Sequence, residues 1–252
     1  SPFDQGQLEV FLATGVDTRY SRRQQSLPAL AAILMAWLRR ESGNCIVYFP
    51  SYRYLQDCMG QLRALGLEQL RPCLWVQQRE QADADRDSLL TLLEERRDVA
   101  AFCILGGIFG EGIDLPGERL TSGVIVGVGL PQFNRETEQL RAWFQQQYGA
   151  GFEYAYLYPG MQKVDQALGR VIRGSGDRGR ALLVDSRYGE RQYRDLLPPW
   201  WRYQPWPGGS SITRAAPSRQ VPGLKCEKLE ASLRCAACGE RRAVSFCLPE
   251  TG

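Results

Sequence analysis

The chain has 252 residues, of which 44% are hydrophobic and 23% are charged, so it has ample apolar material for a globular core. Its 31 Lys and Arg exceed its 28 Asp and Glu by only three, and this balance alone indicates no nucleic-acid partner. The absence of histidine excludes Ser-His-Asp and Cys-His catalysis and any His-ligated metal. We expect no membrane partner and no signal peptide, because no long apolar run and no basic opening followed by an apolar segment occur.

The first half of the chain alternates short apolar runs with longer amphipathic ones. The apolar runs are typical of strands and lie at residues 8–13, 45–49, 71–76 and 100–105. The amphipathic runs are typical of helices and lie at residues 27–40, 52–65 and 83–97. Pro28 fits the first turn of one predicted helix, and Gly66 closes another.

The second half repeats this alternation and then changes character. The predicted elements are a Gly-rich loop at 106–117, a strand at 124–128, helices at 134–148 and 160–173, and a strand at 181–184. Strands that alternate with helices predict an α/β fold with a largely parallel sheet flanked by helices. We expect this domain to span residues 1–203, followed by a linker at 204–224, rich in Pro, Gly and Ser, and a Cys-rich tail at 225–252.

The Gly-rich segment directly follows a predicted strand and carries two acidic residues, Glu111 and Asp114. Glycines allow a backbone to approach a ligand closely, and ligands of open α/β sheets bind beyond the carboxyl ends of the strands. The segment does not fit G-x-G-x-x-G, so it gives little support to a dinucleotide site. The alternative interpretation is a flexible connecting loop.

An arginine-bearing segment follows the last predicted helix. Gln166, Arg170 and Arg173 are spaced i, i+4 and i+7, which predicts that they share one helix face. Two arginines in this arrangement suit a phosphate clamp, because guanidinium groups stabilise the charge of a transferring phosphoryl group. The alternative is a solvated charged face.

The three lysines exclude one way of binding a nucleotide. Lys163, Lys225 and Lys228 are followed by Val, Cys and Leu, whereas a Walker A loop needs Ser or Thr after its lysine. No Asp is followed by Glu, so a DEAD-type box is missing too. This chain by itself cannot hold ATP and magnesium in the P-loop manner.

Three stretches in order resemble the second RecA-like motor domain of superfamily 2 helicases, specifically the XPD/DinG family of iron–sulfur DNA helicases. IVYFPSYRYL at 46–55 is similar to that family's motif IV, and GGIFGEGIDLPGE at 106–118 is similar to motif V. QALGRVIRGSGDRGRALLVDSRY at 166–188 is similar to motif VI and the strand after it, including a final Asp-x-Arg. The resemblance covers about residues 1–203.

The resemblance implies a RecA-like, P-loop NTPase-type fold and the back half of an ATP-dependent DNA helicase. In this family the Walker boxes and the iron–sulfur cluster lie in the first motor domain, which would bind most of the ATP and Mg²⁺. Arg170 and Arg173 would reach the γ-phosphate as arginine fingers, and Gln166 would sense the nucleotide. Glu111 and Asp114 would couple the nucleotide cleft to the DNA track. The isolated chain is then expected to be inactive as an ATPase.

The same resemblance implies contacts with single-stranded DNA. Four residues lie on loops that should face the strand: Ser51, Tyr52, Gly107 and Phe109. Tyr52 is equally suited to the edge of the core. The expected partners are single-stranded DNA and the first motor domain of the same protein, in a monomer in the bacterial cytoplasm.

The tail carries four of the eight cysteines: Cys226, Cys235, Cys238 and Cys247. Cys235 and Cys238 form a CxxC followed by Gly, which is similar to a zinc knuckle, and the outer two stand nine positions to either side. A four-cysteine zinc module is one interpretation, and free or redox-active thiols are the other. Cys45, Cys58, Cys73 and Cys103 are interpreted as reduced core residues. The tryptophans at 200, 201 and 206 are interpreted as a plug that fastens the domain's end, with base stacking as the alternative.

Two other functions stay open. The first is a catalytically inactive RecA-like remnant that binds nucleic acid or a protein through its Cys-rich tail, although a remnant has no catalytic need for Arg170 and Arg173. The second is a small-molecule enzyme that binds a dinucleotide on its Gly-rich loop. The lack of G-x-G-x-x-G argues against it.

Overall fold

The computed structural model describes residues 6–79, 83–106, 119–172, 177–207, 227–234 and 241–248. The chain divides into two compact units, Ser1–Ile212 and Thr213–Gly252, which are described separately. No helix in the described part of the chain is long and apolar enough to cross a membrane.

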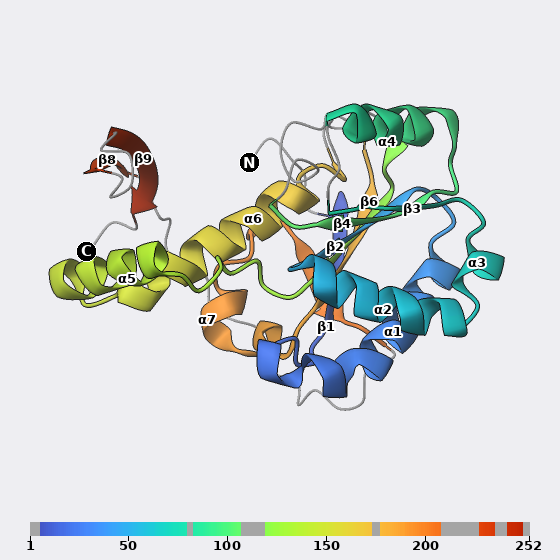
Figure 1. Ribbon diagram of the computed structural model, residues 1–252, viewed down its shortest axis with the longest axis horizontal. Helices are drawn as coiled ribbons and strands as arrows, with labels where there is room; N and C mark the ends of the chain where they lie inside the picture. The colour runs from blue at the N-terminus through green and yellow to red at the C-terminus, as the bar shows by residue number, and fades with distance from the viewer. Residues whose placement is uncertain are drawn as a thin grey trace. The chain divides into compact units, whose positions relative to one another are not determined.

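A seven-stranded sheet forms the centre of the first unit (Figure 1). Its strand order is β3-β4-β2-β5-β6-β1-β7, and every neighbouring pair is parallel. The strands are β1 (Leu8–Ala13), β2 (Cys45–Phe49), β3 (Leu74–Val76), β4 (Ala100–Ile104), β5 (Ser122–Val126), β6 (Gly179–Val184) and β7 (Arg202–Pro205). This arrangement confirms the predicted α/β fold with a parallel sheet.

Helices cover both faces of this sheet, which is why its central strands are continuously apolar. The helices are α1 (Arg23–Arg40), α2 (Tyr52–Ala64), α3 (Leu67–Leu70), α4 (Asp83–Glu95), α5 (Arg135–Tyr148), α6 (Tyr158–Leu168) and α7 (Arg191–Arg194). Shorter turns are η1 (Tyr20–Arg22), the π-helical η3 (Glu153–Leu157) and η4 (Ser186–Gly189). Helices α1 and α2 pack on one face, and α4 and α6 pack on the other, while α5 extends away from the sheet (Figure 1).

The alternation of side chains along β1 shows how the two layers form. Val10 and Leu12 point into the layer shared with α6, whereas Phe11 and Ala13 point into the layer shared with α1. All four are buried. Because the side-chain period of a strand is two, one short sequence supplies both cores.

Helix α1 begins four residues before its predicted start, so Pro28 lies inside it rather than in its first turn. The turn η1 leads directly into α1, and the Arg23 side chain fixes this junction by donating from Nε to the Thr18 carbonyl at 3.1 Å. Sequence pattern alone carries no signal for such a junction, because the residues of η1 are not buried.

Strand β7 was not predicted. All four of its residues are exposed and it includes Pro205, so it lacks the apolar pattern by which strands are recognised. It pairs in parallel with β1, with Glu9 opposite Arg202 and Leu12 opposite Pro205. The predicted domain boundary at residue 203 therefore falls inside a strand of the sheet.

The tryptophans after α7 fasten this end of the domain. Trp206 is 6% exposed and packs against the rings of Phe11 and Trp37, with ring centroids 5.8 and 5.6 Å away. Trp201 is also buried. This confirms the interpretation of an aromatic plug for both residues.

The second unit contains an antiparallel pair of strands, β8 (Glu227–Arg234) and β9 (Arg241–Leu248). Lys228 lies opposite Cys247 at one end, and Arg234 lies opposite Arg241 at the other.

Candidate functional site

The carboxyl ends of the parallel strands bring the predicted motifs to one edge of the sheet. Ser51 lies two residues beyond β2, and Gly106 lies two residues beyond β4. Because β2 and β4 are neighbours, the segments similar to motifs IV and V leave the sheet side by side (Figure 1). In open α/β sheets this edge is where ligands bind.

Most of the segment similar to motif V lies outside the described residues, which resume at Arg119. The predicted site residues in that segment are Gly107, Phe109, Glu111 and Asp114. Their roles stay predictions.

Ser51 begins helix α2. Its Oγ accepts a hydrogen bond from the backbone N–H of Tyr54 at 3.4 Å, as a helix N-cap does, and a second from Nη1 of Arg23 at 3.3 Å. The residue is half-buried at the sheet edge. Ser51 therefore links the end of β2, the start of α2 and the Arg23 side chain at this edge.

Tyr52 is tied to the neighbouring strands. Its hydroxyl accepts a hydrogen bond from Nε2 of Gln77 at 2.8 Å, and Oε1 of Gln77 accepts the backbone N–H of Ile104 at 2.8 Å. Burial raises the pKa of the Tyr52 hydroxyl. Tyr52 is half-buried and lies at the edge of the core, and its predicted contact with DNA stays a prediction.

Helix α6 lies against the start of the motif V segment. Gly106 has a φ of +78°, and a Cβ added there would lie 3.5 Å from Cδ and Cε of Lys163 on α6. Glycine thus suits this position both by its backbone conformation and by the close approach of Lys163. The start of the segment similar to motif V therefore lies against α6, whose last turn begins the segment similar to motif VI.

The predicted helix at 160–173 ends earlier than expected, and this separates the residues of motif VI. The backbone N–H of Gly169 donates to the Asp165 carbonyl at 2.8 Å, and α6 ends at Leu168. Gln166 is exposed on the last turn, whereas Arg170 lies beyond the helix and is 7% exposed. The prediction that they share one helix face is wrong, and Arg173 lies outside the described residues.

Arg170 reaches toward the layer of core between the sheet and α6. Burial raises the pKa of the Tyr48 hydroxyl on β2, and the positive charge of Arg170 opposes that rise. The Arg170 side chain is therefore largely removed from solvent. The spacing of Gln166 and Arg170 did not predict that Arg170 is buried, because that prediction required the helix to continue past Leu168.

A buried polar network joins the ends of β1 and β6 at the same edge. Asp185 is fully buried and accepts hydrogen bonds from the Thr18 hydroxyl and from Nε and Nη2 of Arg187, the last two at 2.8 and 2.9 Å. The Tyr188 hydroxyl donates to the Gly127 carbonyl at 2.8 Å and so adds the end of β5. Asp185 and Arg187 belong to the Asp-x-Arg of the sequence, but their structural role was not predicted.

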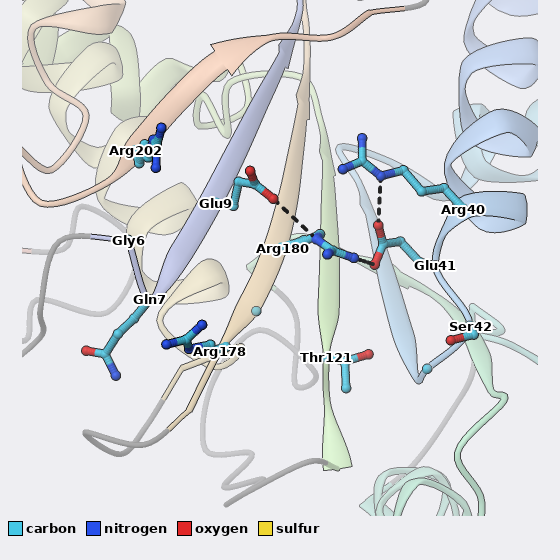
Figure 2. A pocket seen from close by; sticks show the side chains of 12 residues that line it. Gly6, Gln7, Glu9, Arg40, Glu41, Ser42, Thr121, Arg178, Arg180 and Arg202 are labelled. Atoms are coloured by element: carbon cyan, nitrogen blue, oxygen red, sulfur yellow. Dashed lines mark hydrogen bonds and ion pairs between the residues drawn. The ribbon is translucent and has the colours of Figure 1, made fainter.

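A cavity of about 560 Å³ opens at the opposite edge, where β1, β6 and β7 begin (Figure 2). Arg180 lies between two carboxylates there, 3.3 Å from Glu9 and 3.4 Å from Glu41, and Arg40 lies 3.5 Å from Glu41 (Figure 2). These ion pairs tie the end of α1 to β1 and β6. The cavity thus has a structural network at its centre, which the sequence did not reveal.

No described group of three or more His, Cys, Asp or Glu could hold a metal ion. Of the predicted zinc ligands, Cys226, Cys235 and Cys238 lie outside the described residues, and Cys247 lies in β9. Cys247 is six residue pairs along the hairpin from the Arg234–Arg241 pair, roughly 20 Å at the rise of a strand. A tetrahedral zinc site is only a few ångströms across. The predicted zinc site stays a prediction.

A parallel sheet with helices on both faces, and with three motif segments in helicase order, defines a RecA-like helicase domain. The family described as "Helicase C-terminal domain" matches residues 34–204. The chain belongs to this family, and its relatives place it with the XPD/DinG-type domains.

Among curated relatives, the ATP-dependent DNA helicase chl-1 of Caenorhabditis elegans is 26% identical over 181 residues, which is 69% of this chain and 22% of that protein. The helicase subunit XPD of general transcription and DNA repair factor IIH from Dictyostelium discoideum is 24% identical over 62% of this chain and 21% of that protein. The chain therefore spans about a fifth of the length of these relatives.

Solved structures agree on the fold. An XPD helicase matches 79% of this chain and 35% of its own chain, with a TM-score of 0.63 and 20% identity. An apo structure of XPD matches 80% of this chain and 41% of its own, with a TM-score of 0.65 and 21% identity. These values confirm the RecA-like fold.

Proposed function

We propose that this chain is the second motor domain of an ATP-dependent DNA helicase and that it completes an ATP site formed with the first motor domain. The observation that carries the proposal is the meeting of α6 with the start of the motif V segment, through Lys163 and Gly106, in a domain of this family. Relatives named as ATP-dependent DNA helicases support it. ATP and Mg²⁺ would be held mainly by the first motor domain.

We assign the nucleotide-facing roles from the resemblance to motifs V and VI and, for Gln166 and Arg170, from their exposure. Arg173 would be the arginine finger of the segment after α6, and Arg170 would support the inner wall of the site, because its side chain is mostly buried. Gln166 is exposed on the last turn of α6 and would meet the nucleotide there. Glu111 and Asp114 would link this site to the nucleic-acid edge.

Single-stranded DNA would run along the carboxyl edge of the sheet. Ser51 and Tyr52 stand on that edge, and Gly107 and Phe109 belong to the adjacent segment. Contacts from loops to a strand's backbone, with an occasional stacked aromatic ring, suit binding that does not depend on sequence. The DNA contact and the ATP site would then share the motif V segment.

The experiment is DNA-stimulated ATP hydrolysis by this chain joined to its first motor domain. Arg173→Ala should lower kcat roughly 100-fold or more without a change in melting temperature, because a donor to transition-state charge is lost. Arg191→Ala is the matched control, since that side chain is 82% exposed and pairs with Asp195 on the surface. Unchanged turnover in Arg173→Ala would remove Arg173 from the ATP site and favour a binding module without catalysis.

A further inference from the structure

We propose that Arg23 and Ser51 together bind one phosphate of a single nucleic-acid strand, and that the exposed ring of Tyr20 stacks on an adjacent base. The proposal rests on the proposed function, because it adds a contact to the same edge of the sheet. It assigns roles to Tyr20 and Arg23, which lie outside the three motif segments.

Arg23 is held in place by four contacts. Its Nε donates to the Thr18 carbonyl at 3.1 Å, and its Nη1 donates to Ser51 Oγ at 3.3 Å. The guanidinium also lies over the rings of Tyr54, at 4.9 Å, and Tyr20, at 5.6 Å. A cation that is already oriented loses little side-chain entropy when it binds an anion.

The charge of Arg23 has no carboxylate partner within 4 Å in the described part of the chain. The nearby carboxylate of Asp185 is occupied by Arg187 and by the Thr18 hydroxyl. Burial lowers the pKa of the Arg23 guanidinium, in keeping with a cation that is partly desolvated without full compensation. Two of the five N–H groups of Arg23 are used, so three remain for an anion.

The hydroxyl of Ser51 accepts two hydrogen bonds and keeps its proton for a further one. A hydroxyl has two lone pairs and one proton, and both lone pairs of Ser51 are used by the N–H of Tyr54 and by Arg23. Its O–H is therefore free to act as a donor. Beside a guanidinium, a hydroxyl donor suits a phosphate oxygen and not a second cation.

Tyr20 extends this site toward solvent. Its side chain is 77% exposed, and its ring lies beside Arg23. The adjacent arginines are already engaged, Arg19 with Asp17 and Glu190, and Arg22 with Gln25. An exposed aromatic ring next to one uncommitted cation is the combination that binds a base together with its phosphate.

The test is binding of fluorescein-labelled oligo(dT) to the full chain by fluorescence anisotropy over a salt series. Arg23→Gln should weaken binding about tenfold and reduce the slope of log K against log salt by about 0.7, the value for one phosphate contact on a single strand. Arg39→Gln is the matched control, because it removes an exposed arginine from the same helix about 24 Å away. It should leave both values unchanged.

Tyr20→Ala should weaken binding about fivefold or more, as loss of one stacked base does. Because this side chain is exposed, its removal spares the fold, and unchanged affinity in Tyr20→Ala overturns the proposal even if Arg23→Gln proves unstable. Equal affinity and salt slope in wild type and a folded Arg23→Gln also overturn it. If the wild-type chain itself does not bind oligo(dT), the proposed DNA contact of the domain fails instead.

Discussion

Asp185 links two segments that lie far apart in the sequence, the one after β1 and the one after β6. Its carboxylate accepts hydrogen bonds from Thr18 after β1 and from both the backbone and the guanidinium of Arg187 after β6. The Arg187 side chain is 11% exposed and that of Asp185 is fully buried, so the pair is shielded from water. Such a pair tolerates poorly the loss of one partner, because the other charge remains buried.

We expect Asp185→Asn to lower the free energy of unfolding by about 3 kcal/mol or more, since it leaves the Arg187 guanidinium without a buried counter-charge. Urea unfolding followed by circular dichroism measures this. Asp195→Asn breaks a chemically similar pair with Arg191 in which the side chains are 50% and 82% exposed, and it should cost less than about 1 kcal/mol. Equal losses in the two variants would show that burial does not govern the Asp185 pair.

For single residues, the sequence predicted which ones lie at strand ends but not which side chains they contact. It predicted that Ser51 lies at the carboxyl edge of a strand, because an apolar run followed by Pro50 and Ser51 marks that edge. It did not predict Arg23 beside Ser51, since the two meet only after the sheet has formed. The burial of Arg170 was missed because the helix ends at Leu168, before that residue is reached.

At the scale of elements, the end of the domain is set by β7 and the tryptophan after it. The backbone N–H of Trp206 donates to the Leu12 carbonyl at 2.9 Å. Its ring packs against Phe11 of β1 and Trp37 of α1. Arg40 also lies over this ring, 5.8 Å from its centroid. Both the packing of the Trp206 ring and the pairing of β7 with β1 therefore fix the last strand in place.

Trp206→Ala should lower the free energy of unfolding by about 3 kcal/mol or more, because a large buried ring leaves a cavity against Phe11 and Trp37. Chemical unfolding of the full chain measures the loss. Trp143→Ala is the comparison, since that ring is 40% exposed on α5 and should cost distinctly less. A loss in Trp206→Ala no larger than in Trp143→Ala would mean that the plug does not stabilise the domain.

The elements that the sequence predicted well are those whose pattern reflects burial. Strands β1 and β2 begin and end where the apolar runs do, because helices cover both of their faces. Strand β7 escaped prediction because it is an exposed edge. The turn η1 and the early start of α1 were not predicted, because η1 has no buried residues and the Arg23 contact with the Thr18 carbonyl forms only in the folded chain.

At the scale of the whole molecule, burial controls the chemistry of the thiols on both sides of the sheet. Cys45, Cys58 and Cys103 are buried, which confirms that these three lie in the core, while Cys73 is half-buried. Burial raises the pKa of the Cys45 thiol to about 11 and that of Cys58 to about 12. The neutral thiols thus favour the folded state below the unfolded pKa near 9, and this contribution disappears as the pH rises through the folded values.

We expect N-ethylmaleimide at pH 7.5 to label Cys73 well before Cys45, Cys58 and Cys103, because only thiolates react and the buried thiols hold their protons. Peptide mass spectrometry identifies the labelled sites. The free energy of unfolding should also fall between pH 9 and pH 11, because the Cys45 thiol ionises in the unfolded chain there while it stays protonated in the folded protein. Labelling of Cys45 as fast as Cys73 in the folded protein would contradict both statements.

The position of β1 in the sheet has a consequence for how the protein is made. Its two neighbours, β6 and β7, pair with Glu9 through Arg180 and Arg202, which are synthesised about 170 and 190 residues later. At the usual pace of a ribosome this is a delay of roughly 10 to 40 s. During that time this apolar strand has both edges unpaired. Residues 8–13 are therefore prone to aggregation during synthesis, and a chaperone that binds them would protect them until the last strands of the sheet emerge.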